Sequence, residues 1–359
     1  MNFGLSEEQQ LLQDTVAQFL ANECPLPRVR ELYDADEAYD PTLWKGLCEL
    51  GVAGLMAPEE HGGAGLGMVD LALVAEMLGR GAFPGPFLGH ALAIVALLEG
   101  GSAEQKAHWL PRLAAGDALG AVALGEESGA WAAEDWTPAI EGDALSGAKS
   151  FAPCAAGADV LVVGAAGGEL VLVEGGAAGV TLESTDSLDR TRRMDRVVLE
   201  SAACERLADG ARAAARVRDA GLALLAADAF GGATRLVELT VEYAKTREQF
   251  GQTIAHFQAV KHRLADMAVD VEPARGLFWY AAYAWDDLPD QCERAAAHAK
   301  AHLCDRFMEI ARDAVELHGG IGFTWECDVQ FWFKRAMFDR TFLGGPAVHR
   351  ERAAALGGW

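Results

Sequence analysis

The feature that most constrains the fold of this 359-residue chain is the order in which its apolar periodicity changes. In the first third, apolar residues recur every three to four positions, which is typical of amphipathic helices. The middle of the chain has short apolar runs separated by turn residues, which is typical of strands. The helical period then returns and continues to the C terminus. The sequence therefore predicts an α+β protein with a helical domain over 1–118, a β domain over 119–205 and a second helical domain over 206–359.

Individual elements follow from the same patterns. Ser6, followed by acidic residues, is expected to cap a first helix, and the pair Gly142-Asp143 is expected to form a turn between two strands. A long buried helix is expected to end near Thr246. Other helices are expected over 41–50, 68–79, 89–98, 103–114, 256–285, 291–318 and 329–342, and strands over 160–163 and 170–173.

The charge of the chain argues against a nucleic-acid partner. It holds 53 acidic and 30 basic residues, which gives a net charge of −23 and no basic stripe for a phosphate backbone. A few local cations or helix N-termini can still hold the phosphates of a small ligand.

The seven cysteines are scattered and never form a CxxC pair, so the sequence favours reduced thiols and suggests neither a disulfide framework nor a metal site. The first residues lack the charges and the apolar core of a signal peptide, and no uninterrupted apolar run approaches the roughly 18 residues that a membrane span needs. A cytoplasmic protein without a membrane segment is the expectation.

Two glycine-containing motifs carry the chemistry: TREQFG at 246–251, with Gln258 shortly after it, and HGGIGF at 318–323. Arginine pairs with phosphates, an aromatic ring stacks on a base, and glycine lets a ligand approach the backbone closely, so the residue types suit a dinucleotide. Either motif alone also fits a glycine-capped helix end or a turn without any ligand.

The two motifs, in this order and spacing, resemble those of the acyl-CoA dehydrogenases, and the stretches 51–67 and 102–117 resemble that family's N-terminal helices and turns. The resemblance implies a middle β-barrel or sandwich, a C-terminal four-helix bundle, and FAD bound across a dimer interface. It assigns the ADP end of FAD to Arg247, Phe250, Gly251, Gln258, His318, Gly319, Gly320 and Gly322.

The flavin-ring end departs from the family pattern. The turn that usually holds the ring falls on residues 125–129, and the usual tryptophan-x-threonine pair falls on Phe151 and Pro153. Gly125 and Pro153 have no hydroxyl, and Pro153 has no backbone N–H. Phe151 can stack on a ring, although an aromatic residue in a strand is more often part of the core.

The position of the catalytic base departs further. The resemblance places the family's usual glutamate at Leu343, and the alternative position used by some members at Gly221, so the chain has no catalytic residue at either. Asp219, Asp228 and Glu126 are substitutes to consider, although each also fits an ordinary structural role.

Three functions remain open at this point. The favoured one is a subunit of an acyl-CoA dehydrogenase whose homologous partner supplies the glutamate, because the loop after Leu343 resembles base-less subunits that act on steroid-like acyl-CoA thioesters. The others are a homomeric dehydrogenase with an atypical base and a non-catalytic scaffold.

The family implies an electron-transfer flavoprotein as the electron acceptor and a dimer of dimers as the assembly. Four tryptophans, Trp279, Trp285, Trp325 and Trp332, are expected near helix faces that need a partner chain to cover them. The pair His349-Arg350 can contact a ligand phosphate or a partner, although such a pair on a terminal helix is more often surface.

Overall fold

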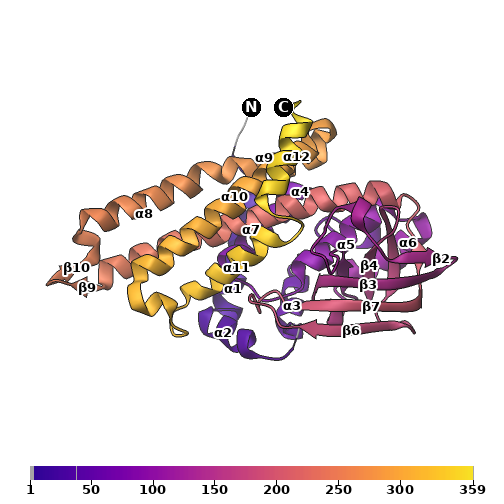
Figure 1. The fold of residues 1–359 in the computed structure, drawn as a ribbon, viewed down its shortest axis with the longest axis horizontal. Helices are drawn as coiled ribbons and strands as arrows, with labels where there is room; N and C mark the ends of the chain where they lie inside the picture. The colour runs from indigo at the N-terminus through magenta and orange to yellow at the C-terminus, as the bar shows by residue number, and fades with distance from the viewer. Residues whose placement is uncertain (1–3, 38, 359) are drawn as a thin grey trace. The chain divides into compact units, whose positions relative to one another are not determined.

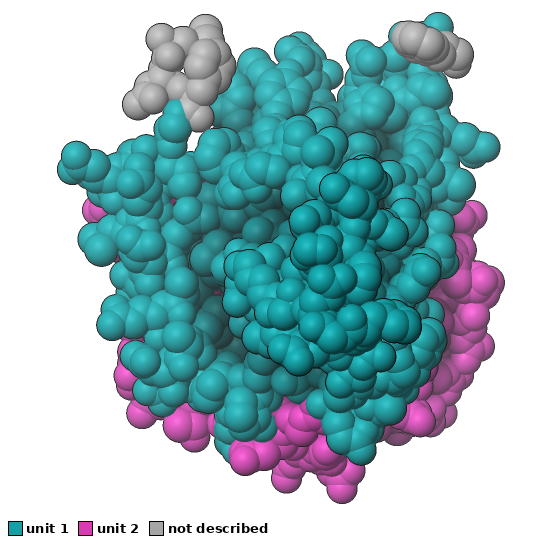
Figure 2. All heavy atoms as spheres, turned by 90° about the vertical axis from the view of Figure 1, so that its left-hand side faces the viewer, with its two compact units in different colours: residues 1–29, 72–83, 222–359 teal, residues 30–71, 84–221 magenta. Residues whose placement is uncertain are grey.

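The computed structural model describes residues 4–37 and 39–358 and groups the chain into two compact units (Figure 2). The first unit comprises 1–29, 72–83 and 222–359, and the second comprises 30–71 and 84–221. Helices begin and end the chain, and all the longer strands lie in the second unit (Figure 1). The fold is the α+β arrangement that the periodicity predicted.

The N-terminal helices form at the predicted places. Ser6 caps α1 through a capping box, in which its Oγ accepts from the N–H of Gln9 at 3.1 Å and the Gln9 side chain accepts from the N–H of Ser6 at 3.1 Å. The six helices are α1 Glu7–Glu23, α2 Leu26–Asp34, α3 Pro41–Glu49, α4 Met68–Arg80, α5 Phe87–Gly100 and α6 Ala103–Ala115. The sequence analysis missed α2, because the prolines at 25 and 27 resemble a break, yet Pro27 lies in the first helical turn, where no N–H is needed.

The strands form two four-stranded sheets with the orders β1-β4-β5-β8 and β2-β3-β7-β6. Pairing is antiparallel except between β1 and β4, and Gly142 takes the positive φ of 63° that the turn between β2 and β3 requires. The strands are β1 Gly120–Ala123, β2 Ala139–Glu141, β3 Ala144–Pro153, β4 Val160–Ala165, β5 Glu169–Glu174, β6 Val180–Thr185, β7 Met194–Ala203 and β8 Glu205–Arg206.

The two sheets share one apolar core. Leu161 and Val171 from the first sheet and Leu145 and Val197 from the second are fully buried in the same cluster. A single isolated bridge, Gly125 to Ser150, also joins the segment after β1 to β3. This arrangement is the sandwich-like β region that the sequence analysis expected.

The C-terminal part is helical, and α8, α9, α11 and α12 all contact α10 (Figure 1). The helices are α7 Gly210–Thr246, α8 Gln258–Val271, α9 Arg275–Asp287, α10 Pro289–His318, α11 Val329–Thr341 and α12 Pro346–Leu356. The single helix expected over 256–285 was wrong: the short 3-10 turn Glu272–Ala274, which contains Pro273, separates α8 from α9 because proline has no N–H to continue the helix. Helix α12, whose first residue is Pro346, is the terminal helix on which the sequence analysis placed His349 and Arg350 without giving its bounds.

Helix α7 is long and apolar enough to cross a membrane by length and composition. However, 83% of its most apolar window is buried inside the protein, as in the core helix of a globular domain. Two of the four tryptophans expected at partner-covered faces are also internal: Trp285 and Trp332 are 5% and 1% exposed. The expectation was wrong for these two, because neighbouring helices of the same unit already cover them, whereas Trp325 is 42% exposed.

The three predicted domains, with boundaries at 118 and 205, stay a prediction. Strands β1 to β8 occur between Gly120 and Arg206, and the contacts divide the chain into two units rather than three.

Helices α4 and α7 approach each other through glycines. A Cβ on Gly231 of α7 would lie 1.9 Å from the carbonyl oxygen of Glu76, and a Cβ on Gly79 of α4 would lie 2.2 Å from that of Asp228. Both distances are far below van der Waals contact and both involve backbone atoms. The two helices therefore pack at this distance only while both positions are glycine.

Replacing Gly231 with alanine is expected to lower the free energy of unfolding by about 1–3 kcal/mol, because the helices must separate to admit the methyl group. Chemical denaturation measures the loss. The matched control is Gly276→Ala in α9, where a Cβ meets nothing within 4 Å. There alanine is expected to be neutral or to stabilise by up to about 1 kcal/mol, since it favours the helix. Equal effects at the two positions would contradict the close approach.

Candidate flavin site

The first glycine motif forms a two-residue hairpin at the end of α7. Strands β9 Glu248–Gln249 and β10 Gln252–Thr253 pair antiparallel, and the turn residues Phe250 and Gly251 have φ of 56° and 80°. Positive φ at both turn positions is the geometry of a tight hairpin, but it disfavours a phenylalanine. Phe250 is also 91% exposed, so its ring contributes little to the packing of this chain.

The second glycine motif follows α10. Gly319 has φ 66° and ψ −146°, a backbone conformation that only glycine adopts readily, and it begins the 3-10 turn Gly319–Phe323. A Cβ on Gly319 or Gly320 would meet nothing within 4 Å, whereas one on Gly322 would lie 2.4 Å from the carbonyl oxygen of Val315. Gly322 is therefore required by packing, and the other two leave the backbone open to a ligand.

Tyr243 of α7 joins the two motifs. Its ring stacks on the imidazole of His318 with centroids 4.2 Å apart, and its O–H donates to the carbonyl oxygen of His318 at 3.1 Å. The N–H of Arg247 in turn donates to the carbonyl oxygen of Tyr243 at 2.8 Å. Figure 1 places the hairpin and the turn after α10 at the same end of the first unit, the end that faces the viewer in Figure 2.

The residues assigned to the ADP end are thus brought together, and most of them are accessible. Arg247, Phe250, Gly251, Gln258, Gly319 and Gly320 are exposed, while His318 and Gly322 are buried. Burial lowers the pKa of His318, and its Nδ1 lies 2.7 Å from the carbonyl oxygen of Ala314. His318 therefore acts as a neutral ring that supports the turn, and it is not an exposed cation.

The position of the usual base lies in a tightly held loop after α11. Leu343 has φ 58° and is 5% exposed, and Gly344 has φ 100°. The Nζ of Lys300 donates to the carbonyl oxygen of Phe342 at 2.9 Å and to that of Asp339, and the Nε2 of His349 lies 2.9 Å from the carbonyl oxygen of Leu343. The side chain of Leu343 cannot accept a proton, yet the backbone keeps a conformation that is costly for leucine.

The expectation that His349 is a surface residue was wrong. His349 is 2% exposed, burial lowers its pKa to about 4, and its Nδ1 has no hydrogen-bond partner within residues 4–37 and 39–358. Its Nε2 is occupied by the Leu343 loop, so His349 holds backbone. Arg350 lies at the surface, as expected, and pairs with Asp305.

The three substitute bases are all engaged in ion pairs. Asp228 is 5% exposed at its side chain and accepts from the Nη1 of the fully buried Arg335 at 3.1 and 3.2 Å. Asp219 lies 2.8 Å from Arg218, and Gly221, two residues further along, has no side chain. Each of these two carboxylates is therefore occupied by a cation of this chain.

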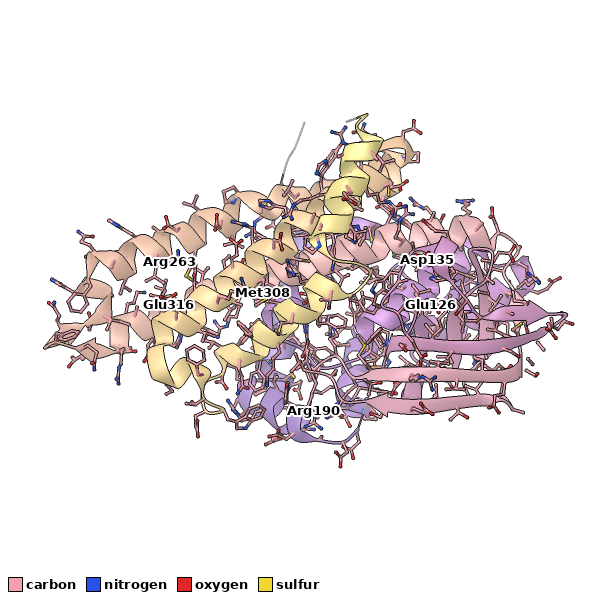
Figure 3. The ribbon with its side chains drawn as sticks, viewed as in Figure 1. Glu126, Asp135, Arg190, Arg263, Met308 and Glu316 are labelled. Atoms are coloured by element: carbon pink, nitrogen blue, oxygen red, sulfur yellow. The ribbon has the colours of Figure 1, made fainter. Side chains whose placement is uncertain are left out.

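Glu126, in the strand-rich part of Figure 3, is held in the same way. Its carboxylate accepts from the Nζ of Lys149 at 2.5 Å and from the Oγ1 of Thr137 at 2.6 Å. Burial acts to raise the pKa of Glu126, but the hydrogen bonds from Lys149 and Thr137 outweigh it and hold that pKa below its usual value. Burial lowers the pKa of Lys149 to about 8.

The rest of the flavin-ring segment is crowded. A Cβ on Gly125 would lie 2.8 Å from the carbonyl oxygen of Ser150 and 3.0 Å from the ring of Trp131. That ring also lies 6.0 Å from Phe151, which has φ 60° and is 36% exposed. Pro153 is buried at the end of β3. Gly125 and Pro153 therefore offer a flavin ring no side-chain hydroxyl, and Pro153 offers no backbone donor.

Sequence reasoning missed the residues that support the loops of the site, which are Tyr243, Lys300 and His349. Tyr243 lies four positions before Arg247 on the same helix, so its helical spacing was a usable signal. Lys300 lies 42 positions before Phe342, whose carbonyl it holds, and only the fold brings them together.

Comparisons with known proteins agree with this geometry. Residues 6–117 match the model of the acyl-CoA dehydrogenase N-terminal domain, and residues 197–356 match that of the C-terminal domain. The chain is 36% identical over 352 residues to acyl-CoA dehydrogenase IpdE2 of Mycolicibacterium smegmatis, covering 98% of this chain and 99% of that protein.

Two solved structures are similar over nearly the whole chain. One is the Tcur3481-Tcur3483 steroid ACAD G363A variant, with a TM-score of 0.90 and 31% identity over 98% of both chains. The other is the ChsE4-ChsE5 complex from Mycobacterium tuberculosis, with a TM-score of 0.90 and 28% identity over 99% of this chain and 98% of that one. From the family models, the identity to a full-length relative and the shared fold, the chain belongs to the acyl-CoA dehydrogenase family.

Proposed function

We propose that this chain is one subunit of a heteromeric, FAD-dependent acyl-CoA dehydrogenase, which introduces a double bond between the α and β carbons of an acyl-CoA thioester. In this assignment the chain binds the ADP end of FAD, and a homologous subunit supplies the catalytic glutamate. The observation that carries the proposal is a contrast within the site. The two glycine turns are exposed and open, whereas the position of the base is filled by Leu343.

The ADP end fits the residues of the glycine turns. Arg247 is an exposed cation suited to the pyrophosphate, and Phe250 is an exposed ring suited to the adenine. Gly251, Gly319 and Gly320 have open space where a Cβ would be, so a ligand can approach their backbone. Within this chain the ring of Phe250 makes an edge contact with Phe257, with centroids 6.0 Å apart, and is otherwise 91% exposed, so its place in a strained turn favours a ligand or partner here over a scaffold role.

Dehydrogenation of the thioester requires one acceptor for a hydride and one acceptor for a proton. When bound, FAD accepts a hydride from the β carbon of the thioester. The α proton needs a base, and this chain offers Leu343 and Gly221 at the two usual positions and ion-paired carboxylates at the three substitutes. A missing general base typically reduces the rate by about two to four orders of magnitude. The α proton is therefore assigned to a glutamate of the partner subunit.

The similar proteins support the partner and the substrate class. One similar structure is a steroid ACAD whose name joins two chains, and another is a two-component complex. We assign a bulky, steroid-like acyl-CoA as the substrate and a dimer of dimers as the assembly. An electron-transfer flavoprotein as electron acceptor and a cytoplasmic location complete the proposal.

Purification of the chain alone and together with its homologous partner tests the central claim. The lone chain is expected to retain little flavin and to dehydrogenate acyl-CoA at least about a hundredfold more slowly than the co-purified pair, because it lacks the base and the ring contacts. Flavin absorbance and turnover with an artificial electron acceptor measure the two quantities. A yellow lone chain with the activity of the pair would refute the proposal.

Removal of the arginine in the first glycine turn is expected to weaken FAD binding by the pair. Arg247→Ala should raise the Kd for FAD about tenfold or more, since a charge-assisted contact to phosphate is lost. Lys245→Ala is the matched control, because Lys245 is an exposed cation two residues away that pairs with Glu242. Titration of the flavin-free pair with FAD measures the Kd of each variant. Equal Kd values for the two variants would contradict a contact between Arg247 and the phosphates of FAD.

Tyr243 is expected to affect FAD binding indirectly, because it holds the two glycine turns together. Tyr243→Ala removes both the stack on His318 and the hydrogen bond, so FAD binding should weaken about tenfold, whereas Tyr243→Phe keeps the stack and should lose only part of this. The same titration measures both variants. An unchanged affinity of the alanine variant would show that the turns hold their arrangement without the tyrosine.

Amide substitutions distinguish the heteromer from a homomer with an atypical base. Asp228→Asn and Glu126→Gln are each expected to lower the free energy of unfolding by about 3 kcal/mol, because each leaves a buried cation without its anion, while turnover per folded pair stays unchanged. Denaturation and turnover are measured on the same samples. Glu127→Gln, at an exposed carboxylate, is the control for both. A collapse of turnover without a loss of stability in either variant would favour the homomer.

A further inference from the structure

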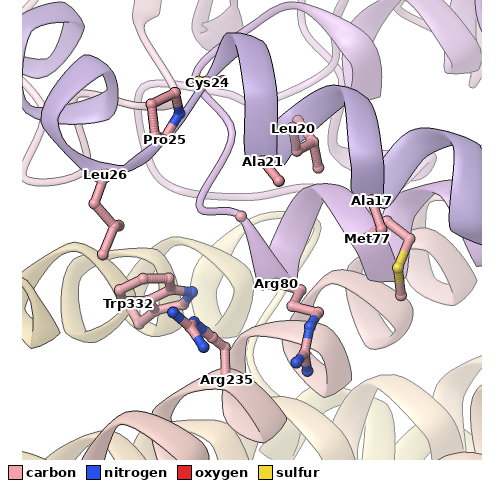
Figure 4. Close-up of a pocket in the computed structure, with 11 residues that line it drawn as sticks. Ala17, Leu20, Ala21, Cys24, Pro25, Leu26, Met77, Arg80, Arg235 and Trp332 are labelled. Atoms are coloured by element: carbon pink, nitrogen blue, oxygen red, sulfur yellow. The ribbon is translucent and has the colours of Figure 1, made fainter.

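The first unit contains a cavity that none of the flavin-site residues lines (Figure 4). Its volume is about 350 Å³, which lies within the range typical of small-molecule sites, roughly 300–1,000 Å³. Helices α1, α2, α4, α7 and α11 and the residues that follow α1 and α4 form its walls. The lining residues are Ala17, Leu20, Ala21, Cys24, Pro25, Leu26, Met77, Arg80, Gly81, Arg235 and Trp332.

Most of the wall is apolar. Leu20 and Leu26 come from α1 and α2, and Met77 comes from α4. Trp332 is 1% exposed, and its Nε1 already donates to the carbonyl oxygen of Gly79 at 3.0 Å. Its indole therefore offers the cavity ring carbon and no hydrogen-bond donor. A hydrocarbon body suits this part of the wall.

The polar part of the wall consists of Arg80 and Arg235. Glu238 accepts from the Nη2 of Arg80 at 2.6 and 2.7 Å, and from the Nη1 of Arg235 at 3.3 Å. Burial raises the pKa of Glu76 to about 6, while the charges of Arg275 and Arg80 act to lower it, so Glu76 faces Arg80 as well as Arg275. Arg80 therefore has two carboxylates near it, whereas Arg235 makes only the longer contact with Glu238 among the described residues.

Arg235 is the residue available to a ligand. Among the described residues its contact with Glu238 uses Nη1, and its side chain is 34% exposed. In Figure 4 the side chains of Arg235 and Trp332 both reach toward the cavity that they line. A guanidinium next to an apolar wall pairs well with a single carboxylate.

We propose that this cavity binds a small amphipathic carboxylate, with its hydrocarbon chain against Leu20, Met77 and Trp332 and its carboxylate on Arg235. The inference does not depend on the proposed catalytic role, because no lining residue belongs to the glycine turns or to the Leu343 loop.

Calorimetric titration of the full chain, in the assembly in which it purifies, tests the site with octanoate and with 1-octanol as the uncharged analogue. Octanoate is expected to bind saturably with one site per chain. Octanol is expected to bind at least about tenfold more weakly, because it lacks the charge that pairs with Arg235. The absence of saturable octanoate binding, or equal binding of the two probes, overturns the proposal.

Variants locate the binding. Ala21→Trp places a large ring at the cavity and should weaken octanoate binding at least tenfold, whereas Asn22→Trp, at the next position of α1, which is exposed and does not line the cavity, should leave it unchanged. Arg235→Gln should weaken binding about tenfold, and Arg263→Gln, at an arginine that pairs with Asp313, should not. Flavin content serves as a separate measure of folding. Octanoate binding that survives both Ala21→Trp and Arg235→Gln places the ligand elsewhere and overturns the proposal.

Discussion

The buried ion pair between Asp228 and Arg335 organises the first unit. It joins α7 to α11, and the Nη2 of Arg335 also donates to the carbonyl oxygen of Phe83 at 3.0 Å. Two charges taken out of water are tolerated only when each satisfies the other, so neither side chain is free for another task. Gly79 and Gly231 let α4 approach α7 beside this pair, since a Cβ at either position would collide with backbone. The fold thus commits Asp228, one of the carboxylates that follow the family's alternative base position along α7, to a structural role.

The two ends of the proposed flavin site need different kinds of contact. At the ADP end the requirements are an exposed cation, an exposed ring and backbone without Cβ, and these are fixed by local turns whose residues are adjacent in sequence. At the ring end the requirements are hydroxyls and backbone donors. Gly125 and Pro153 have no hydroxyl, Pro153 has no N–H, and the Glu126 carboxylate is engaged by Lys149. In the proposed heteromer this chain supplies the contacts of the first end, and the partner supplies those that the second end lacks.

The local features could be predicted from sequence, and the long-range ones could not. Ser6 with Gln9 and the turn at Gly142 are read from neighbours, because a capping box and a hairpin depend on residues at most three positions apart. The partners of Glu126 and Asp228 lie 23 and 107 positions away, so only the fold decides that these carboxylates are structural. His349 was misjudged for the same reason, since a histidine on a terminal helix looks exposed until the loop that it supports is known. A proline does not by itself show where a helix ends. Pro27 lies in the first turn of α2, whereas Pro273 lies in the 3-10 turn that follows α8.

The Leu343 loop retains a conformation that its own side chain does not favour. A left-handed backbone costs leucine of the order of 1 kcal/mol or more, and the loop keeps it because Lys300 and His349 hold the carbonyl oxygens of Phe342 and Leu343. Burying Lys300 and His349 carries its own cost, which appears as lowered pKa values of both groups. The shape of the loop is therefore set by its packing against α10 and α12 and not by the backbone preference of Leu343.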